Sequence, residues 1–164
     1  MRKRFWLAFF LTALAATGLH FVYALIPHPL VGLFLPVRES VWEHLKLLYW
    51  PFLCAAFILG RKTRQPERFW SGMLAALLEM PALLLGVYYT LSAGFGVEAL
   101  WLDLTLFYLI LAGGFWAGYR LAENGKCSRF AGILVILSGL YGAALILFTA
   151  APPELPVFIE KIIK

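Results

Sequence analysis

The sequence predicts an all-α protein, a polytopic membrane helix bundle of five transmembrane helices. Of its 164 residues, 62% are hydrophobic and only 14% are charged, and the mean hydropathy is +0.82. A soluble domain usually has about 45–50% apolar and about 25% charged residues. Long apolar runs alternate here with short clusters of charge. We therefore expect one integral membrane domain over residues 1–164, surrounded by a lipid bilayer.

Five apolar runs are each long enough to cross a hydrocarbon layer of about 30 Å, which takes about 20 residues of helix. In lipid the backbone must satisfy its own hydrogen bonds, and none of these runs alternates like a barrel strand, so helices are predicted. The first run extends over about 22 residues and suits a membrane span better than the shorter apolar part of a signal peptide. The predicted helices cover residues 5–26, 41–60, 69–92, 99–121 and 130–150.

The distribution of Lys and Arg predicts the orientation of these helices. Basic clusters precede the first helix and lie between the second and third and between the fourth and fifth, whereas the other two connections hold only Arg38. The positive-inside rule then places the N-terminus in the cytoplasm and the C-terminus outside, in a bacterial cytoplasmic (inner) membrane. The net charge of +5 comes from these clusters, so nucleic acid is not expected as a partner. The proline-rich connection 27–36 is expected at the outer interface or as a short re-entrant piece.

Ionisable residues from four of the five predicted helices converge on overlapping depths of the membrane. A rise of about 1.5 Å per residue puts most of them in the outer half and Glu79 near mid-membrane. Ionisable groups at such depths are costly and are candidates for a functional site. Small residues spaced three and four positions from Glu79 predict that it points into the bundle. The candidate metal ligands are His20, Glu43, His44, Glu79 and Asp103, with Lys46 as charge partner, Glu39 at the mouth and Tyr23 on the face of His20.

The charge balance of these residues favours a function. With Arg38 and Glu39 set aside as an external pair, three buried acids face Lys46 alone, an excess of two negative charges. Such an excess persists only if acids are protonated, if histidines become charged, or if a cation binds. Two histidines with carboxylates are suitable ligands for zinc, iron or manganese, although no specific metal motif such as HExxH is present.

Some of these polar residues also have a purely structural explanation. Ser40 and Glu43 match a capping box, in which a hydroxyl and a carboxylate satisfy the free N–H groups at a helix start. Lys46 either extends outward along the helix or neutralises a buried acid. Pro51 and Pro81 are predicted to kink their helices close to the polar residues.

Two motifs give the chain a resemblance to a known group of proteins. The first is H-F-V-Y at residues 20–23, and the second is P-V-R-E-S-V-W-E-H-L-K at residues 36–46. The chain resembles an uncharacterised family of small multi-pass bacterial membrane proteins, with a signature similar to H-F-x-Y followed by P-V-N-E-S-x-W-E-H-x-K. The resemblance spans the chain and implies the architecture and the choice of residues, but it implies no reaction. Arg38 stands where the signature has Asn, which argues against a role for a side-chain amide there.

Three functions from different classes fit these observations. The first is an outward-facing polar site that binds or moves a cation, proton or small solute. The second is an intramembrane metal-dependent hydrolase acting on a lipid or lipid-linked substrate, with Glu43 or Glu79 as general base. The third is an accessory subunit, whose polar residues pair helices in a homo-oligomer or with a membrane partner. A haem held between His20 and His44 is a weaker alternative.

Overall fold

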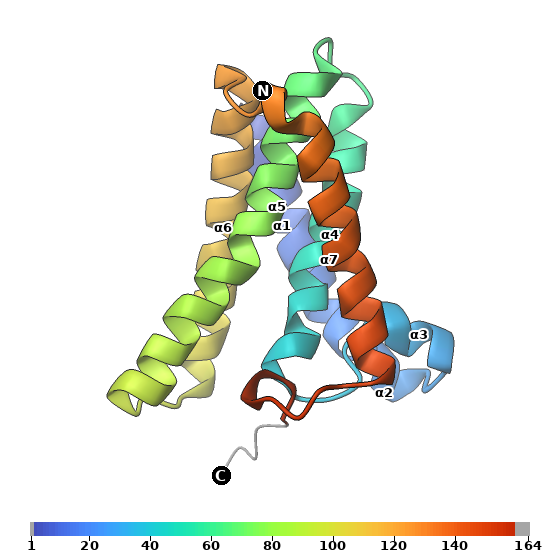
Figure 1. Cartoon of the computed structure of the whole chain (residues 1–164), viewed down its shortest axis with the longest axis vertical. Helices are drawn as coiled ribbons and strands as arrows, with labels where there is room; N and C mark the ends of the chain where they lie inside the picture. The colour runs from blue at the N-terminus through green and yellow to red at the C-terminus, as the bar shows by residue number, and fades with distance from the viewer. Residues whose placement is uncertain (1, 160–164) are drawn as a thin grey trace.

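A computed structural model describes residues 2–159, and within that range every regular element is helical, which confirms the all-α prediction. Long helices run side by side along one axis, and short helices cover one end of the bundle (Figure 1). The elements are α1 (Arg2–His20), α2 (Val22–Leu25), α3 (Pro29–Phe34), α4 (Val41–Gly60), α5 (Pro66–Tyr89), a π-helical turn (Thr90–Gly94), α6 (Leu100–Asn124), a 3-10 turn (Ser128–Phe130), α7 (Ala131–Ala150) and a 3-10 turn (Pro156–Phe158).

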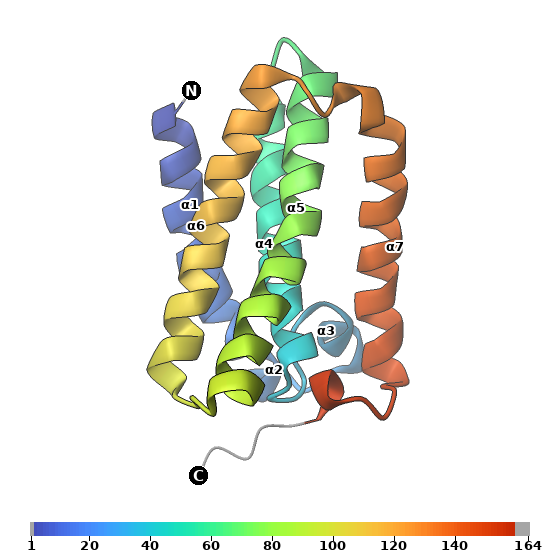
Figure 2. The same ribbon diagram turned by 60° about the vertical axis from the view of Figure 1, so that its left-hand side comes forward.

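Four stretches of helix in the described chain are long and apolar enough to cross a membrane, one fewer than the five predicted. The helix α4 is not among them, and it carries Glu43, His44 and Lys46 in its first turns. In space α4 nevertheless lies among the long helices (Figure 2), and ten of its residues are buried. The four apolar stretches, which fit a multi-pass membrane protein, are Lys3–Leu25, Pro66–Gly94, Leu100–Asn124 and Ser128–Ala150.

The first predicted helix is interrupted near its end. The α-helix α1 stops at His20, the Phe21 N–H bonds to the Gly18 carbonyl at 3.2 Å in a tighter turn, and the chain resumes as the one-turn helix α2. Beyond it, the proline-rich connection forms α3, whose start is capped by His28. The break places the His20 side chain at a helix end, beside the start of α4.

The most extensive contact between two helices of the bundle is that of α5 with α6. A Cβ atom at Gly72 would lie 2.5 Å from the backbone nitrogen of Ala122, so these helices touch through their backbones. Gly114 and Gly118 of α6 lack the side chains that would collide with the α5 residues Met80 and Met73, respectively. Small residues allow such close approach between membrane helices.

The two ends of the bundle differ in the segments that they carry. The N-terminus, the 61–65 connection and the 125–127 connection lie together at one end, and α2, α3 and the turn Pro156–Phe158 lie at the other (Figures 1 and 2). The three basic segments therefore share one end, as the predicted orientation requires. Which side of a membrane this end faces remains a prediction.

Candidate functional site

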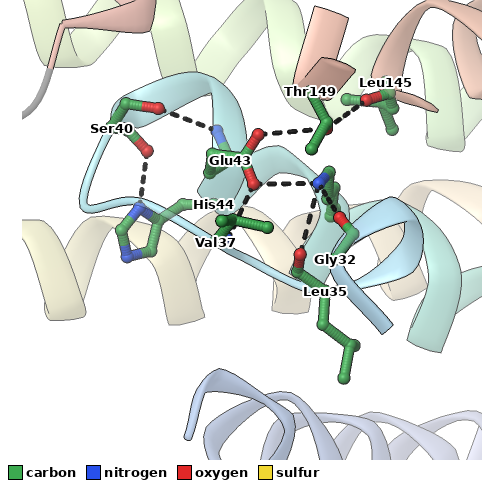
Figure 3. Close-up of polar contacts among 9 residues, drawn as sticks. Gly32, Leu35, Val37, Ser40, Glu43, His44, Leu145 and Thr149 are labelled. Carbon is green, nitrogen blue, oxygen red and sulfur yellow. Dashed lines mark hydrogen bonds and ion pairs between the residues drawn. The ribbon is translucent and has the colours of Figure 1, made fainter. Parts of the chain in front are cut away.

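The start of α4 is fixed by a cap that the sequence predicted in part. Ser40 has an extended backbone, and its hydroxyl accepts a hydrogen bond from the Glu43 N–H at 3.3 Å. In a complete capping box the Glu43 carboxylate would return to the Ser40 N–H. It instead accepts from the Val37 N–H at 2.9 Å (Figure 3). The carboxylate thus ties the preceding loop to the helix.

A buried ion pair lies on this face of α4. The Lys46 side chain is fully buried, and its ammonium donates to Glu43 Oε2 at 2.8 Å. Its other two hydrogen bonds go to the carbonyls of Gly32 at 2.7 Å and Leu35 at 3.2 Å, in the α3 region (Figure 3). An ammonium has three donors, so Lys46 is saturated. Neutralisation of a buried acid is the role that the structure gives to Lys46.

The same carboxylate reaches the last helix. Glu43 Oε1 accepts a hydrogen bond from the Thr149 hydroxyl of α7 at 3.1 Å. Tyr23 packs on the other side of this region, where its ring lies 3.2 Å from the position of a Cβ at Gly32. We call Val37, Glu43, Lys46, Gly32 and Thr149 the clamp, because they join α3, α4 and α7. All the contacts of Glu43 are structural, and it does not line the cavity described below.

On another face of α4 the structure brings together two histidines and a carboxylate. His20 Nε2 lies 3.5 Å from Glu39 Oε1, and His44 Nε2 lies 3.4 Å from Glu39 Oε2. The two imidazole rings stack with centroids 5.1 Å apart. One ligand atom from each residue lies within 4.8 Å of the others. Glu39, predicted at the mouth of the site, is the acid that the two histidines share.

The orientation of His44 is set by its own helix. His44 Nδ1 lies 2.7 Å from the Ser40 carbonyl oxygen, which can only accept a hydrogen bond. Nδ1 therefore donates to this carbonyl, and Nε2 is the ring nitrogen that faces Glu39. Metal-ligating histidines commonly donate their second ring N–H to a backbone carbonyl or carboxylate in this manner.

The spacing of this group is compatible with direct ion pairs and also leaves room for a shared ion. Separations of 3.4 and 3.5 Å are longer than the usual 2.7–3.2 Å of an N–H···O bond. Ligands about 2.0–2.1 Å from a tetrahedral zinc ion lie roughly 3.3–3.4 Å from one another. The two separations are measured to different oxygens of Glu39, and one ligand atom from each of His20, Glu39 and His44 lies within 4.8 Å of the others. Their side chains are 26%, 58% and 32% exposed, so the group is open to the outside.

A cavity of about 590 Å³ adjoins this group, between α1, α4, α5 and α6. The two histidines, Glu39 and Asp103 contribute its ionisable side chains. On the wall between α1 and α6, the hydroxyls of Thr17 and Tyr108 are hydrogen-bonded to each other at 2.7 Å. The remaining surface is largely apolar, and its aliphatic and aromatic residues include Val41, Leu47, Leu84, Leu100, Leu104, Leu106 and Phe107.

Two predicted ligands lie apart from the three-residue group. Asp103 lines the same cavity but is outside the group, and it has interactions of its own. Glu79 lies on an exposed face of α5, so the prediction that it points into the bundle is wrong. The glycine that contacts α6 is Gly72, whereas a Cβ at Gly86 would meet nothing within 4 Å. Ala82 and Gly86, the small residues that follow Glu79, are likewise exposed.

These positions also reduce the predicted excess of buried negative charge. Glu43 is neutralised by Lys46, Glu79 is exposed, and Asp103 is half-buried on the cavity wall. The feature that favours a cation is therefore the geometry of His20, Glu39 and His44 and not an excess of charge. Thr149 and Tyr108 were not anticipated as polar partners, because hydroxyls within long apolar runs give no distinctive signal in a single sequence.

The comparisons with known proteins agree with the resemblance noted in the sequence. The chain matches the sequence model of a family described as "Family of unknown function (DUF6512)" over residues 2–164. The curated proteins and the solved structures gave no match. Because the family model covers nearly the whole chain, the protein belongs to the DUF6512 family.

Proposed function

We propose that this protein binds a divalent transition-metal ion, with zinc as the best fit, through His20, Glu39 and His44. The observation that carries the proposal is the convergence of three ligand atoms within 4.8 Å of one another, from two helix ends that are distant in sequence. Imidazole nitrogens and a carboxylate are ligands that zinc, iron and manganese accept.

Two further features support a metal rather than a pair of structural histidines. The hydrogen bond from His44 Nδ1 to the Ser40 carbonyl holds the ring before any ligand arrives. Three protein ligands also leave a fourth tetrahedral position, as in zinc sites that bind water or a substrate. Two neutral imidazoles and one carboxylate would leave a bound dication with a net charge of about +1, which favours an oxygen ligand there.

The membrane placement is part of the same proposal. We place α4 as a fifth membrane-crossing helix, with its polar first turns shielded by α1, α3 and α7. The basic end of the bundle then faces the cytoplasm, and His20, Glu39 and His44, which we call the metal group, face outward in a bacterial inner membrane. This arrangement gives an ion access from outside without exposing Lys46 and Glu43 to lipid.

The test is the metal content of the purified full-length protein, loaded with zinc, exchanged into metal-free buffer and measured by elemental mass spectrometry. We expect about one zinc per chain, and a loss of affinity of at least about tenfold in His44→Ala and in Glu39→Gln. Glu79→Gln is the matched control, since it removes a carboxylate from an exposed face of the same bundle. Substitution with cobalt adds a visible absorption band if the ion is four-coordinate.

Absence of stoichiometric metal in the wild-type protein would refute the proposal. Equal metal content in the His44→Ala and Glu79→Gln variants would also refute it, because the ion would then be held elsewhere. Circular dichroism of each variant establishes that a lost ion does not reflect a lost fold.

A second candidate function, a metal-dependent hydrolase acting on a lipid, is favoured by the apolar cavity that opens beside the metal group. The residues first considered as its general base do not suit that role. Glu43 is held by Lys46, Val37 and Thr149, and Glu79 lies on an outer face. Asp103 is the remaining carboxylate on the cavity wall besides Glu39. Zinc-dependent release of fatty acid from a long-chain ester, lost in His44→Ala and retained in Glu79→Gln, is the test of this function.

A further inference from the structure

We propose that the cavity between α1, α4, α5 and α6 binds one acyl chain of an amphiphile, whose carbonyl-bearing head lies at His20, Glu39 and His44. The position of the head rests on the proposed metal site. The position of the chain rests on the cavity itself and on its place among the membrane-crossing helices.

The depth of the cavity matches one leaflet of a bilayer. Along α6 its lining runs from Leu100 to Tyr108, eight residue steps apart, which corresponds to about 12 Å of helix. A hydrocarbon core of about 30 Å gives about 15 Å for each leaflet. The volume of about 590 Å³ falls within the range of about 300–1,000 Å³ that is usual for ligand sites. An acyl chain entering from one leaflet fits these dimensions.

The lining of the cavity favours an apolar ligand. Leu47 and Leu84 belong to the lining from α4 and α5, and Leu106 and Phe107 belong to it from α6. The Thr17 hydroxyl on the wall is already bonded to its own helix and to Tyr108. A polar solute would therefore lose hydration along most of the walls without gaining equivalent hydrogen bonds. This favours a hydrocarbon chain over a hydrated ion or a sugar.

The mouth of the cavity has two chemically different sides. On one side Phe21 and Leu100 are each 59% exposed and Leu104 is 49% exposed, so the lining continues into apolar outer surface. On the other side lie Glu39 and the two histidines. An amphiphile has the same division between an apolar chain and a polar head. Lipid is also the molecule present at the highest concentration around helices of this kind.

The head is identified by the fourth position of the metal group. A carboxylate or an ester or amide carbonyl offers the oxygen atom that a zinc ion with two histidines and one carboxylate accepts. The ligand class is therefore a fatty acid or a fatty acyl ester or amide. No bond is made or broken in this inference.

The experiment uses the full-length protein in lipid nanodiscs and a palmitic acid that carries a diazirine on its chain. After illumination, mass spectrometry of peptides locates the label. We expect it on the α1 segment 16–21 and on the α6 segment 100–108. In Leu106→Trp, which fills the cavity, labelling of these segments falls at least about tenfold, whereas zinc content is unchanged. Leu84→Phe provides a second, smaller obstruction if Leu106→Trp does not fold.

The matched control is Leu140→Trp, which adds the same indole to an exposed position of α7. It should leave the labelling of the cavity segments unchanged. Labelling spread over the outer faces of α6 and α7, and insensitive to Leu106→Trp or Leu84→Phe, would overturn the inference. Cavity labelling in a wild-type protein without zinc supports the chain site and refutes only the metal proposal, so the two failures are distinguishable. In His44→Ala we expect labelling to persist but to need more probe, because the head has lost its ion.

Discussion

Replacement of Lys46 by methionine tests the clamp most directly. The substitution leaves an unbranched apolar side chain that is one atom shorter, and it removes an ammonium that is fully buried and donates three hydrogen bonds. Glu43 then remains as a buried carboxylate without its cation, and two backbone carbonyls lose their donor. Breaking a buried ion pair by removal of one partner costs about 3–5 kcal/mol. We expect this loss in the free energy of unfolding of Lys46→Met.

The assay is thermal unfolding in nanodiscs, followed by tryptophan fluorescence. For a chain of this size, about 3–5 kcal/mol corresponds to a fall in the unfolding temperature of roughly 6–20 °C. Arg38→Met is the matched control, because it removes an exposed cation eight positions away, and it should change stability by no more than about 0.5 kcal/mol. In the double variant Lys46→Met/Glu43→Gln the unpaired charge is gone, so part of the stability should return.

Two results would refute this reasoning. Lys46→Met could unfold within about 2 °C of the wild type, which would mean that the ammonium contributes less than about 1 kcal/mol. Alternatively, the double variant could be destabilised by the sum of the two single changes, which would mean that Glu43 and Lys46 do not interact energetically.

Three other substitutions probe the packing and the helix start, each by the same unfolding assay. Gly72→Ala should cost about 1–3 kcal/mol or more, because its methyl group would meet the backbone of α6, while Gly86→Ala, which meets nothing within 4 Å, should be neutral or slightly stabilising. Ser40→Ala should cost about 0.5–2 kcal/mol through loss of the helix cap. Tyr49→Phe should cost about 1 kcal/mol, because the buried hydroxyl donates to the carbonyl of Ser138 at 2.9 Å. Equal effects of Gly72→Ala and Gly86→Ala, or no effect of the other two, would contradict these contacts.

Hydropathy located the helices of this protein because the need to satisfy backbone hydrogen bonds in lipid leaves few alternatives. Hydropathy was less decisive for α4. Glu43 and Lys46 neutralise each other inside the bundle, but a hydropathy scale counts each of them separately as a polar residue. Lys46 was predicted either to extend outward or to neutralise a buried acid, and the sequence did not choose among the acids. The structure pairs it with Glu43, three positions away on the same helix.

Contacts between distant segments were harder to predict. The spacing of small residues around Glu79 marked a smooth face of α5, but periodicity does not say whether such a face meets another helix or the surroundings. Glu39 was placed at the edge of the site, and only the break after His20 shows that both histidines approach it. The bond between Thr149 and Glu43 joins residues 106 positions apart, and no local pattern indicates it.

The clamp has a consequence for the order in which the protein assembles. The ribosome makes α4 long before α7, yet the hydroxyl that completes the bonding of Glu43 belongs to Thr149, near the end of α7. Until that residue has emerged, the nascent α4 carries an incompletely satisfied acid next to the segment that holds His44. Complete bonding of the Glu43 carboxylate is therefore a late event in biosynthesis, reached when the last helix docks.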